Sequence, residues 1–71
     1  MTEADREIAT YATLMRGYVK KADAGPSPAD VYLTMLRDVG GTPRTTKILV
    51  AALLEAGANR EHVSIALERA Y

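Results

Sequence analysis

The side chains that could carry out a reaction are few, and their spacing does not bring them together. His62 is the only histidine, and Ser27 and Ser64 are the only serines. Ser64 lies two residues from His62, and side chains at that spacing on a helix point in different directions. The acidic residues are scattered, without the carboxylate pair in an apolar cleft that acid–base catalysis needs. We therefore predict no catalytic residue and a chain that is not an enzyme.

The sequence also lacks the residues that a metal or cofactor site needs. The chain contains no cysteine, which removes disulfides, thiolate zinc ligands and a cysteine nucleophile. A single histidine cannot build a zinc site alone. The sequence Gly40-Gly41-Thr42 lacks the lysine and the spacing of a phosphate-binding P-loop. We predict no metal site, no cofactor and no small-molecule substrate.

Length and charge indicate one small domain over residues 1–71, with nine Lys and Arg against nine Asp and Glu. The longest apolar run, Ile48–Leu54, has seven residues, whereas a membrane-spanning helix needs about 20. The N-terminus is acidic and polar, unlike a secretory signal, so we expect a cytoplasmic protein. Burial of apolar surface and ordering of the chain each amount to about 100 kcal/mol at this length. Because these two terms nearly cancel, a bound partner would help the chain to fold.

Four segments carry the periodicity and the end signals of helices. They span about residues 3–23, 28–39, 43–56 and 60–70. Each follows a residue type that caps helices, namely Thr2, Ser27, Thr42 and Asn59, and Asp5 and Asp30 are expected to complete the first two caps. The connections have about two to five residues, so we predict an all-α bundle. Because its middle is apolar on every side, the third helix is expected to be central.

Three kinds of residue inside these helices need an interpretation. Tyr11 and Tyr18 fall on the inner stripe of the first helix and Tyr32 on the crowded surface of the second, so we expect core aromatics whose hydroxyls reach the protein edge. Gly17 costs about 1 kcal/mol relative to alanine and marks either a close helix crossing or a tolerated weakness. His62, in the first turn of the last helix, is expected to lie on the solvated surface.

One large apolar residue lies against the pattern of its own helix. Ile65 is about 200° from the inner residue Val63 on the helix wheel. The helix over residues 28–39 is also apolar around most of its circumference. Both features would be relieved by an interface. We therefore predict a small regulator or adaptor that binds another protein or a second copy of itself, through the candidate residues Ile65, Val31, Leu33 and Leu36.

Residues 49–68 resemble the helix-turn-helix of DNA-binding proteins. The resemblance rests on Ala56 and Gly57 at the turn, Asn59 as the cap of the second helix, and Val63 and Ala66, which would lock that helix onto the first. It implies an alternative function as a transcriptional regulator. The helix after Gly57 would then read the major groove, and the third helix would reach phosphates, with DNA contacts from Arg60, Glu61, Ser64, Ile65, Arg44 and Lys47.

The same stretch is also similar to the first turn of ubiquitin-associated domains. This second resemblance rests on Gly57, on the pair Arg60-Glu61 and on the pair Ala66-Leu67. It implies binding of a ubiquitin-like partner. Both resemblances share one pattern, which is a helix, a glycine turn and a capped second helix.

Overall fold

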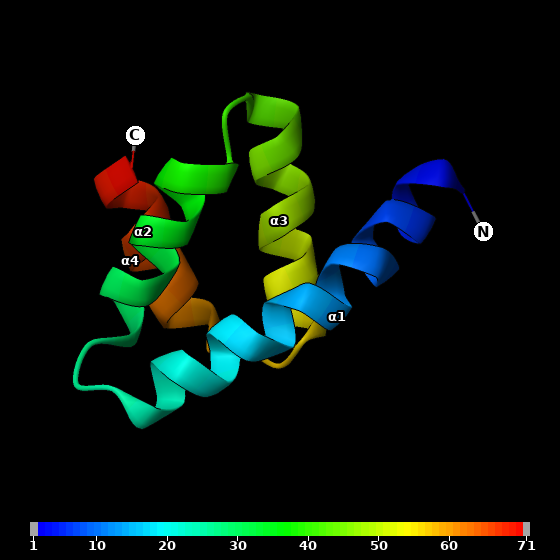
Figure 1. Cartoon of the computed structure of the whole chain (residues 1–71). Coiled ribbons are helices and arrows are strands. Elements are labelled where there is room, and N and C mark those ends of the chain that lie inside the picture. Colours follow the sequence, from blue (N-terminus) through cyan, green and yellow to red (C-terminus); the bar gives the residue numbers. More distant parts are fainter. Residues whose placement is uncertain (1, 71) are drawn as a thin grey trace.

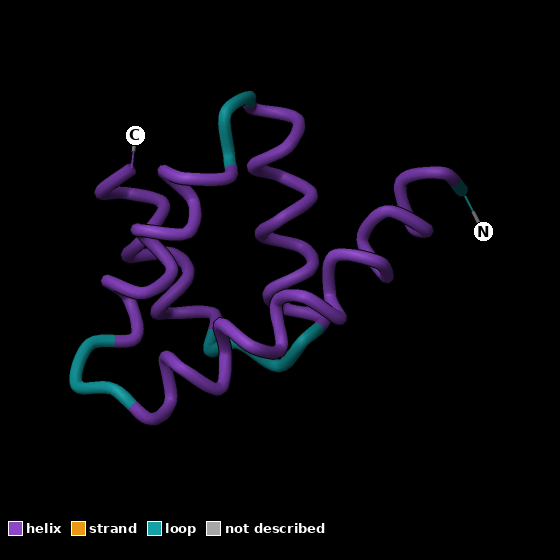
Figure 2. Tube along the Cα trace, viewed as in Figure 1, coloured by secondary structure: helices purple, strands orange, loops and turns teal. Residues whose placement is uncertain are grey.

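The computed structural model describes residues 2–70, which form four α-helices and, within that range, no strand (Figure 1). They are α1 (Glu3–Ala24), α2 (Pro28–Val39), α3 (Pro43–Glu55) and α4 (Arg60–Ala70). The all-α prediction is confirmed, and each helix end lies within one residue of its predicted place. Only short loops connect the helices (Figure 2). None of the helices in the described range has the length and apolar character of a membrane span.

Three of the four predicted caps are present. The Thr2 hydroxyl accepts a hydrogen bond from the Asp5 N–H at 3.2 Å, and the Asp5 carboxylate accepts one from the Thr2 N–H at 3.3 Å, which completes a capping box. The Thr42 hydroxyl accepts from the Thr45 N–H at 3.2 Å. The Asn59 side-chain oxygen accepts from the N–H of the second residue of α4 at 2.9 Å. These bonds satisfy N–H groups that have no partner inside the helix.

The cap predicted at Ser27 is wrong. Its side chain makes no capping hydrogen bond, because its backbone, with ψ of 85°, leaves the extended conformation in which a cap hydroxyl reaches the first turn. Helix α2 begins instead with Pro28 and with the Ser27 carbonyl, which accepts from the Asp30 and Val31 N–H groups. The Asp30 carboxylate does not complete a cap. It accepts a hydrogen bond from Arg69 of α4 at 3.2 Å.

The turn between α3 and α4 has the geometry that its glycine predicts. Gly57 has φ of 97°, a conformation that disfavours any other residue. The Ala58 N–H donates to the Leu53 carbonyl at 2.9 Å, and the Gly57 N–H donates to the Leu54 carbonyl at 3.1 Å. This pair of bonds is a Schellman motif, which satisfies the last carbonyls of α3. The local conformation at Gly57 therefore accounts for the end of α3 without any contact from α4.

Helix α1, not α3, joins the parts of the molecule. It packs along both α3 and α2, whereas α2 packs on α4 and α3 has little direct contact with α4. Figure 1 shows α1 running from its end beside α2 to its start beyond α3. The prediction of a central third helix is therefore wrong, because α3 packs mainly on α1, whereas α1 and α2 each pack extensively on two helices. The buried core is Ala12, Met15, Val19, Ala22, Tyr32, Met35, Leu36, Leu49, Ala52, Leu53, Val63 and Ala66.

The N-terminal half of α1 extends past this core (Figures 1 and 2). Residues 2–6 are exposed, and Glu7 and Ile8 are only half-buried. The accessible surface of the molecule is 4708 Å², whereas a compact monomer of this mass is expected to have about 4,300 Å². The projecting half of α1 is thus surface that the chain leaves uncovered.

Two polar atoms are enclosed without a hydrogen-bond partner among the described residues, the Tyr32 hydroxyl and His62 Nδ1. The Tyr32 side chain is entirely buried, so the prediction that its hydroxyl reaches the edge is wrong. Burial, and to a lesser extent the Asp23 carboxylate, raises the pKa of Tyr32. His62 is half-buried rather than on the solvated surface, since it lies one turn before the buried Ala66 on α4. Gly17 is exposed and has no neighbour at its missing Cβ, which fits the tolerated weakness and not a helix crossing.

Candidate protein-binding surface

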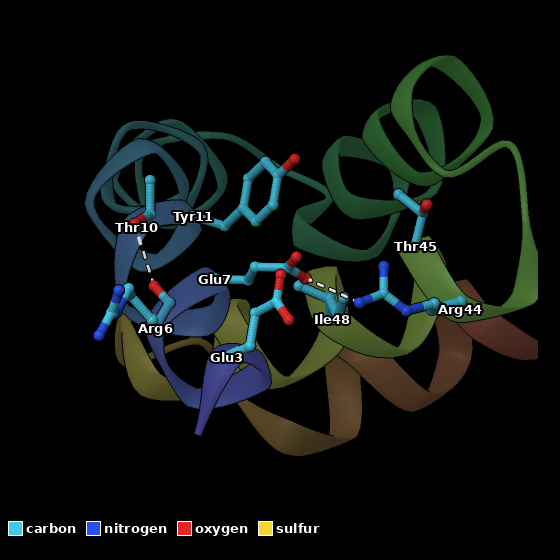
Figure 3. Close-up of a pocket in the computed structure, with 8 residues that line it drawn as sticks. All are labelled: Glu3, Arg6, Glu7, Thr10, Tyr11, Arg44, Thr45 and Ile48. Atoms are coloured by element: carbon cyan, nitrogen blue, oxygen red, sulfur yellow. Dashed lines mark hydrogen bonds and ion pairs between the residues drawn. The ribbon is translucent and has the colours of Figure 1, made fainter. Parts of the chain in front are cut away.

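Two hollows lie where the N-terminal halves of α1 and α3 meet. We call them the polar hollow and the apolar cleft. The polar hollow has a volume of about 680 Å³ and is lined by Glu3, Arg6, Glu7, Thr10, Tyr11, Arg44, Thr45 and Ile48 (Figure 3). The apolar cleft has a volume of about 460 Å³ and is lined by Ala4, Ile8, Pro43, Arg44, Lys47 and Ile48. Arg44 and Ile48 border both, so the hollows flank the contact of these two residues with α1.

One ion pair joins α1 to α3 across the polar hollow. Arg44 Nη2 donates to a Glu7 carboxylate oxygen at 3.3 Å, and the two side chains are 71% and 32% exposed. A pair this exposed is worth at most about 1 kcal/mol, and salt weakens it. Figure 3 shows Tyr11 pointing into the same space and the Thr10 hydroxyl turned to the Arg6 carbonyl. These groups can exchange hydrogen bonds and charge with a partner, but they do not pair a nucleophile with a base.

The apolar cleft has a different character. Its floor is formed by Ala4, Ile8, Pro43 and Ile48. Thr42 caps α3 and Pro43 begins it. Within that helix Ile48 is only 9% exposed, whereas its neighbour Lys47 is exposed. Lys47 forms no ion pair with any residue that the structure describes, whereas Arg44 is held by Glu7. The cleft therefore offers apolar contact beside one available positive charge.

The four predicted interface residues do not form one surface. Leu36 is 2% exposed and belongs to the core, so its prediction as an interface residue is wrong. Val31 and Leu33 are half-buried, pack against the core and lie about 200° apart around α2. Ile65 is half-buried rather than fully outside. Leu36 is interior because the apolar circumference of α2 is covered by α1 on one side and α4 on the other.

The predicted DNA contacts are divided between two helices. Arg60, Glu61 and Ser64 are exposed near the start of α4. Arg44 and Lys47 lie near the start of α3, at the end away from the glycine turn. The Arg44 guanidinium is bonded to Glu7, and Glu3 lines the same hollow, so negative charge stands where a phosphate would approach. Val63 and Ala66 are buried as the resemblance implies, but α4 packs mainly on α2. DNA binding stays a prediction.

Several surface residues were not singled out from the sequence. The floor of the apolar cleft was missed because it depends on how α1 and α3 cross, which no local pattern states. Leu14 and Val39 are the exposed large hydrophobic residues, 61% and 46% exposed. For Leu14 a signal was present. It lies about 120° from Ile8 on the helix wheel, outside the inner stripe.

Within residues 2–70 no group of three or more His, Cys, Asp or Glu side chains is placed to hold a metal ion. The surface is therefore characterised by its apolar floor, its exposed hydrophobic side chains and its few charges. Comparison with known proteins finds no family model, no curated protein and no solved structure that matches this chain.

Proposed function

We propose that the chain is a small non-enzymatic regulator or adaptor that acts by binding another protein, and that the partner docks in the apolar cleft. The observation that carries this proposal is the open apolar floor of Ala4, Ile8, Pro43 and Ile48, next to the projecting half of α1.

The chemistry of the cleft selects the kind of partner. An apolar groove between two helices can receive the apolar face of a third helix, with large side chains at i, i+3, i+4 and i+7. Lys47 lies at the rim without an ion pair among the described residues, so an acidic residue beside the apolar face would be favoured. The expected occupant is an acidic amphipathic helix.

The alternative as a helix-turn-helix regulator has less support. The exposed charges of α4 are mixed, because Arg60 and Arg69 are balanced by Glu61 and Glu68, and Arg69 is bonded to Asp30. The whole chain has no net charge, whereas DNA-binding domains concentrate positive charge on one face. The proposal of a protein partner needs no basic face.

The test is a titration of isotope-labelled protein with a synthetic acidic peptide, followed by nuclear magnetic resonance. The peptide is an amphipathic helix of about 15 residues with leucines at i, i+3, i+4 and i+7 and glutamates beside them. Chemical-shift changes are expected at the amides of Ile8, Lys47 and Ile48. The substitution Lys47→Glu, at an exposed position, should weaken peptide binding about threefold to fivefold. Arg37→Glu, at an exposed position of α2 outside the cleft, is the matched control and should bind like the parent.

Two results would contradict the proposal. Equal binding of a peptide with lysines in place of the glutamates, or shifts away from the cleft, would remove its stated chemistry. Salt-sensitive binding of labelled duplex DNA between about 50 and 200 mM salt, lost in Arg60→Ala, would favour the helix-turn-helix alternative instead.

A further inference from the structure

The outward side of α1 carries no charge over about two turns. Residues 8–15 include no Asp, Glu, Lys or Arg. Of these, Ala9, Thr10, Thr13 and Leu14 are exposed, and we call them the outer face of α1. They line a shallow hollow together with Arg6. A solvated helix face is ordinarily charged or polar, and a leucine that is 61% exposed at the border of this face needs an explanation.

Nothing in the described part of the chain covers this face. The residues that α1 turns to the core, such as Met15 and Val19, lie on the opposite side of the helix. One turn beyond Thr13, Gly17 is exposed and has no atom within 4 Å of the place where a Cβ would stand. A second helix could therefore approach this side of α1 closely.

The charges at the two ends of α1 identify which helix would fit. Residues 3–7 hold Glu3, Asp5 and Glu7 against Arg6, a formal net charge of −2. Residues 16–24 hold Arg16, Lys20 and Lys21 against Asp23, a formal net charge of +2. Two copies of α1 placed side by side in the same direction would bring like charges together. Placed in opposite directions, they bring the acidic end of each beside the basic end of the other, with their macrodipoles opposed.

We propose that two copies of the chain associate by antiparallel pairing of their outer faces around a two-fold axis near Thr13. Such an axis makes the contact self-complementary, as homodimer interfaces are. It sets Ala9 opposite Gly17 of the partner subunit and places Leu14 against the partner's threonines. The same register leaves two unfavourable pairings, because Arg6 lies opposite Lys20 of the partner subunit and Glu3 lies opposite Asp23 of the partner subunit. The contact uses a different side of α1 from the apolar cleft, so it stands or falls independently of the proposed function.

The interface is small, and this sets the concentration range of the test. One pair of helices buries less than the roughly 1,200–2,000 Å² of a standard stable interface. We therefore expect association that appears only as the concentration rises from about 10 μM to about 1 mM. Sedimentation equilibrium of the full chain should show the mean mass rising from that of the 7.7 kDa monomer toward twice that value.

Surface variants test which residues make the contact. Leu14→Glu should abolish association, because it places a charge in the apolar contact. Helicity should be unchanged, because the side chain is exposed in the monomer. Val39→Glu is the matched control, since it alters an exposed hydrophobic side chain at the end of α2 and should associate like the parent. Arg6→Glu should tighten association roughly threefold to tenfold, because each dimer gains two ion pairs with Lys20 of the partner subunit.

Cysteine cross-linking tests the direction, because the chain has no cysteine of its own. Thr13→Cys should form a disulfide-linked dimer on mild oxidation. Ala9→Cys and Gly17→Cys should each cross-link poorly alone and efficiently when mixed. Efficient cross-linking of each variant with itself would mean parallel helices and would overturn the proposal. A monomer at about 1 mM, or a dimer indifferent to Leu14→Glu, would overturn it as well.

Discussion

The two halves of α1 have the same apolar periodicity but differ in burial. In the second half Ala12, Met15, Val19 and Ala22 are buried, whereas residues 2–11 contain no buried side chain, although Ile8 and Tyr11 continue the same stripe. The difference is in what covers them. Helix α1 as a whole packs on α3 and α2, and residues of its first half line two hollows together with the start of α3. An amphipathic stripe that its own chain does not finish covering is therefore where a partner is expected.

The largest expected difference between the halves is in the cost of removing a stripe residue. Met15→Ala should lower the free energy of unfolding by about 2–5 kcal/mol, because it leaves a cavity in a closed core. Ile8→Ala should cost about 1 kcal/mol, because the side chain is only half-buried and solvent fills the space. Urea denaturation followed by circular dichroism measures both. Equal costs would contradict the contrast between the halves.

The core contains an unpaired polar group whose removal should stabilise the fold. The Tyr32 hydroxyl is enclosed without a hydrogen-bond partner among the described residues. Such a group costs about 1–3 kcal/mol. Tyr32→Phe should therefore raise the free energy of unfolding at pH 7 by about 1 kcal/mol or more. A loss of stability of the same size would mean that the hydroxyl has a bonded partner.

The same residue makes stability depend on alkaline pH. Burial, assisted by Asp23, raises the pKa of Tyr32 above its ordinary value of 10.0. The unfolded chain thus releases this proton at a lower pH than the folded chain. The contribution of Tyr32 to stability is complete below about pH 10 and is lost as the pH rises through the folded pKa. Urea melts at pH 7 and about pH 11 should show a smaller alkaline loss in Tyr32→Phe than in the parent.

On the exposed side of the second half of α1, Gly17→Ala should stabilise the fold. The position is helical, exposed and open at the missing Cβ, so the substitution gains helix propensity of about 1 kcal/mol without a collision. The melting temperature should rise by about 4–8 °C for a domain of this size. A fall would mean that Gly17 has a close neighbour, contrary to the exposed position found here.

The smallest effect is expected at the ion pair of the projecting half. Glu7→Gln breaks the contact with Arg44 and should cost about 0.2–1 kcal/mol, less at high salt. Asp30→Asn breaks the comparably exposed contact with Arg69 on the other side of the molecule and is the matched control. Both costs should be similarly small. A large cost for Glu7→Gln alone would mean that the first half of α1 is fixed by this one bond.

Most of the fold could be predicted because its signals are local. The Thr2, Thr42 and Asn59 caps and the Gly57 stop each involve groups within five residues, and all four are in place. The Ser27 prediction is wrong because a cap needs a particular backbone conformation as well as a hydroxyl, and Ser27, with ψ of 85°, does not have it. The prediction of a central third helix rests on apolar content, which does not determine which helices pack together.

The candidate site was harder to predict because it depends on the crossing of helices. Leu36 was assigned to an interface that α1 and α4 already fill, and Ile65 is partly covered in the same way. The apolar cleft joins Ala4 to Lys47, residues far apart in the chain. Only the exposure of Leu14 could be predicted from the local sequence, because Leu14 lies outside the inner apolar stripe of α1.

Amide hydrogen exchange along α1, with and without the acidic peptide, tests the central claim most directly. In the free chain we expect fast exchange for residues 3–11 and slow exchange for residues 12–24, because only the second half is closed by neighbouring helices. With the peptide bound, exchange in residues 3–11 should slow at least about tenfold while the second half stays unchanged. Uniform protection of α1 in the free chain, together with no change on adding the peptide, would contradict the account.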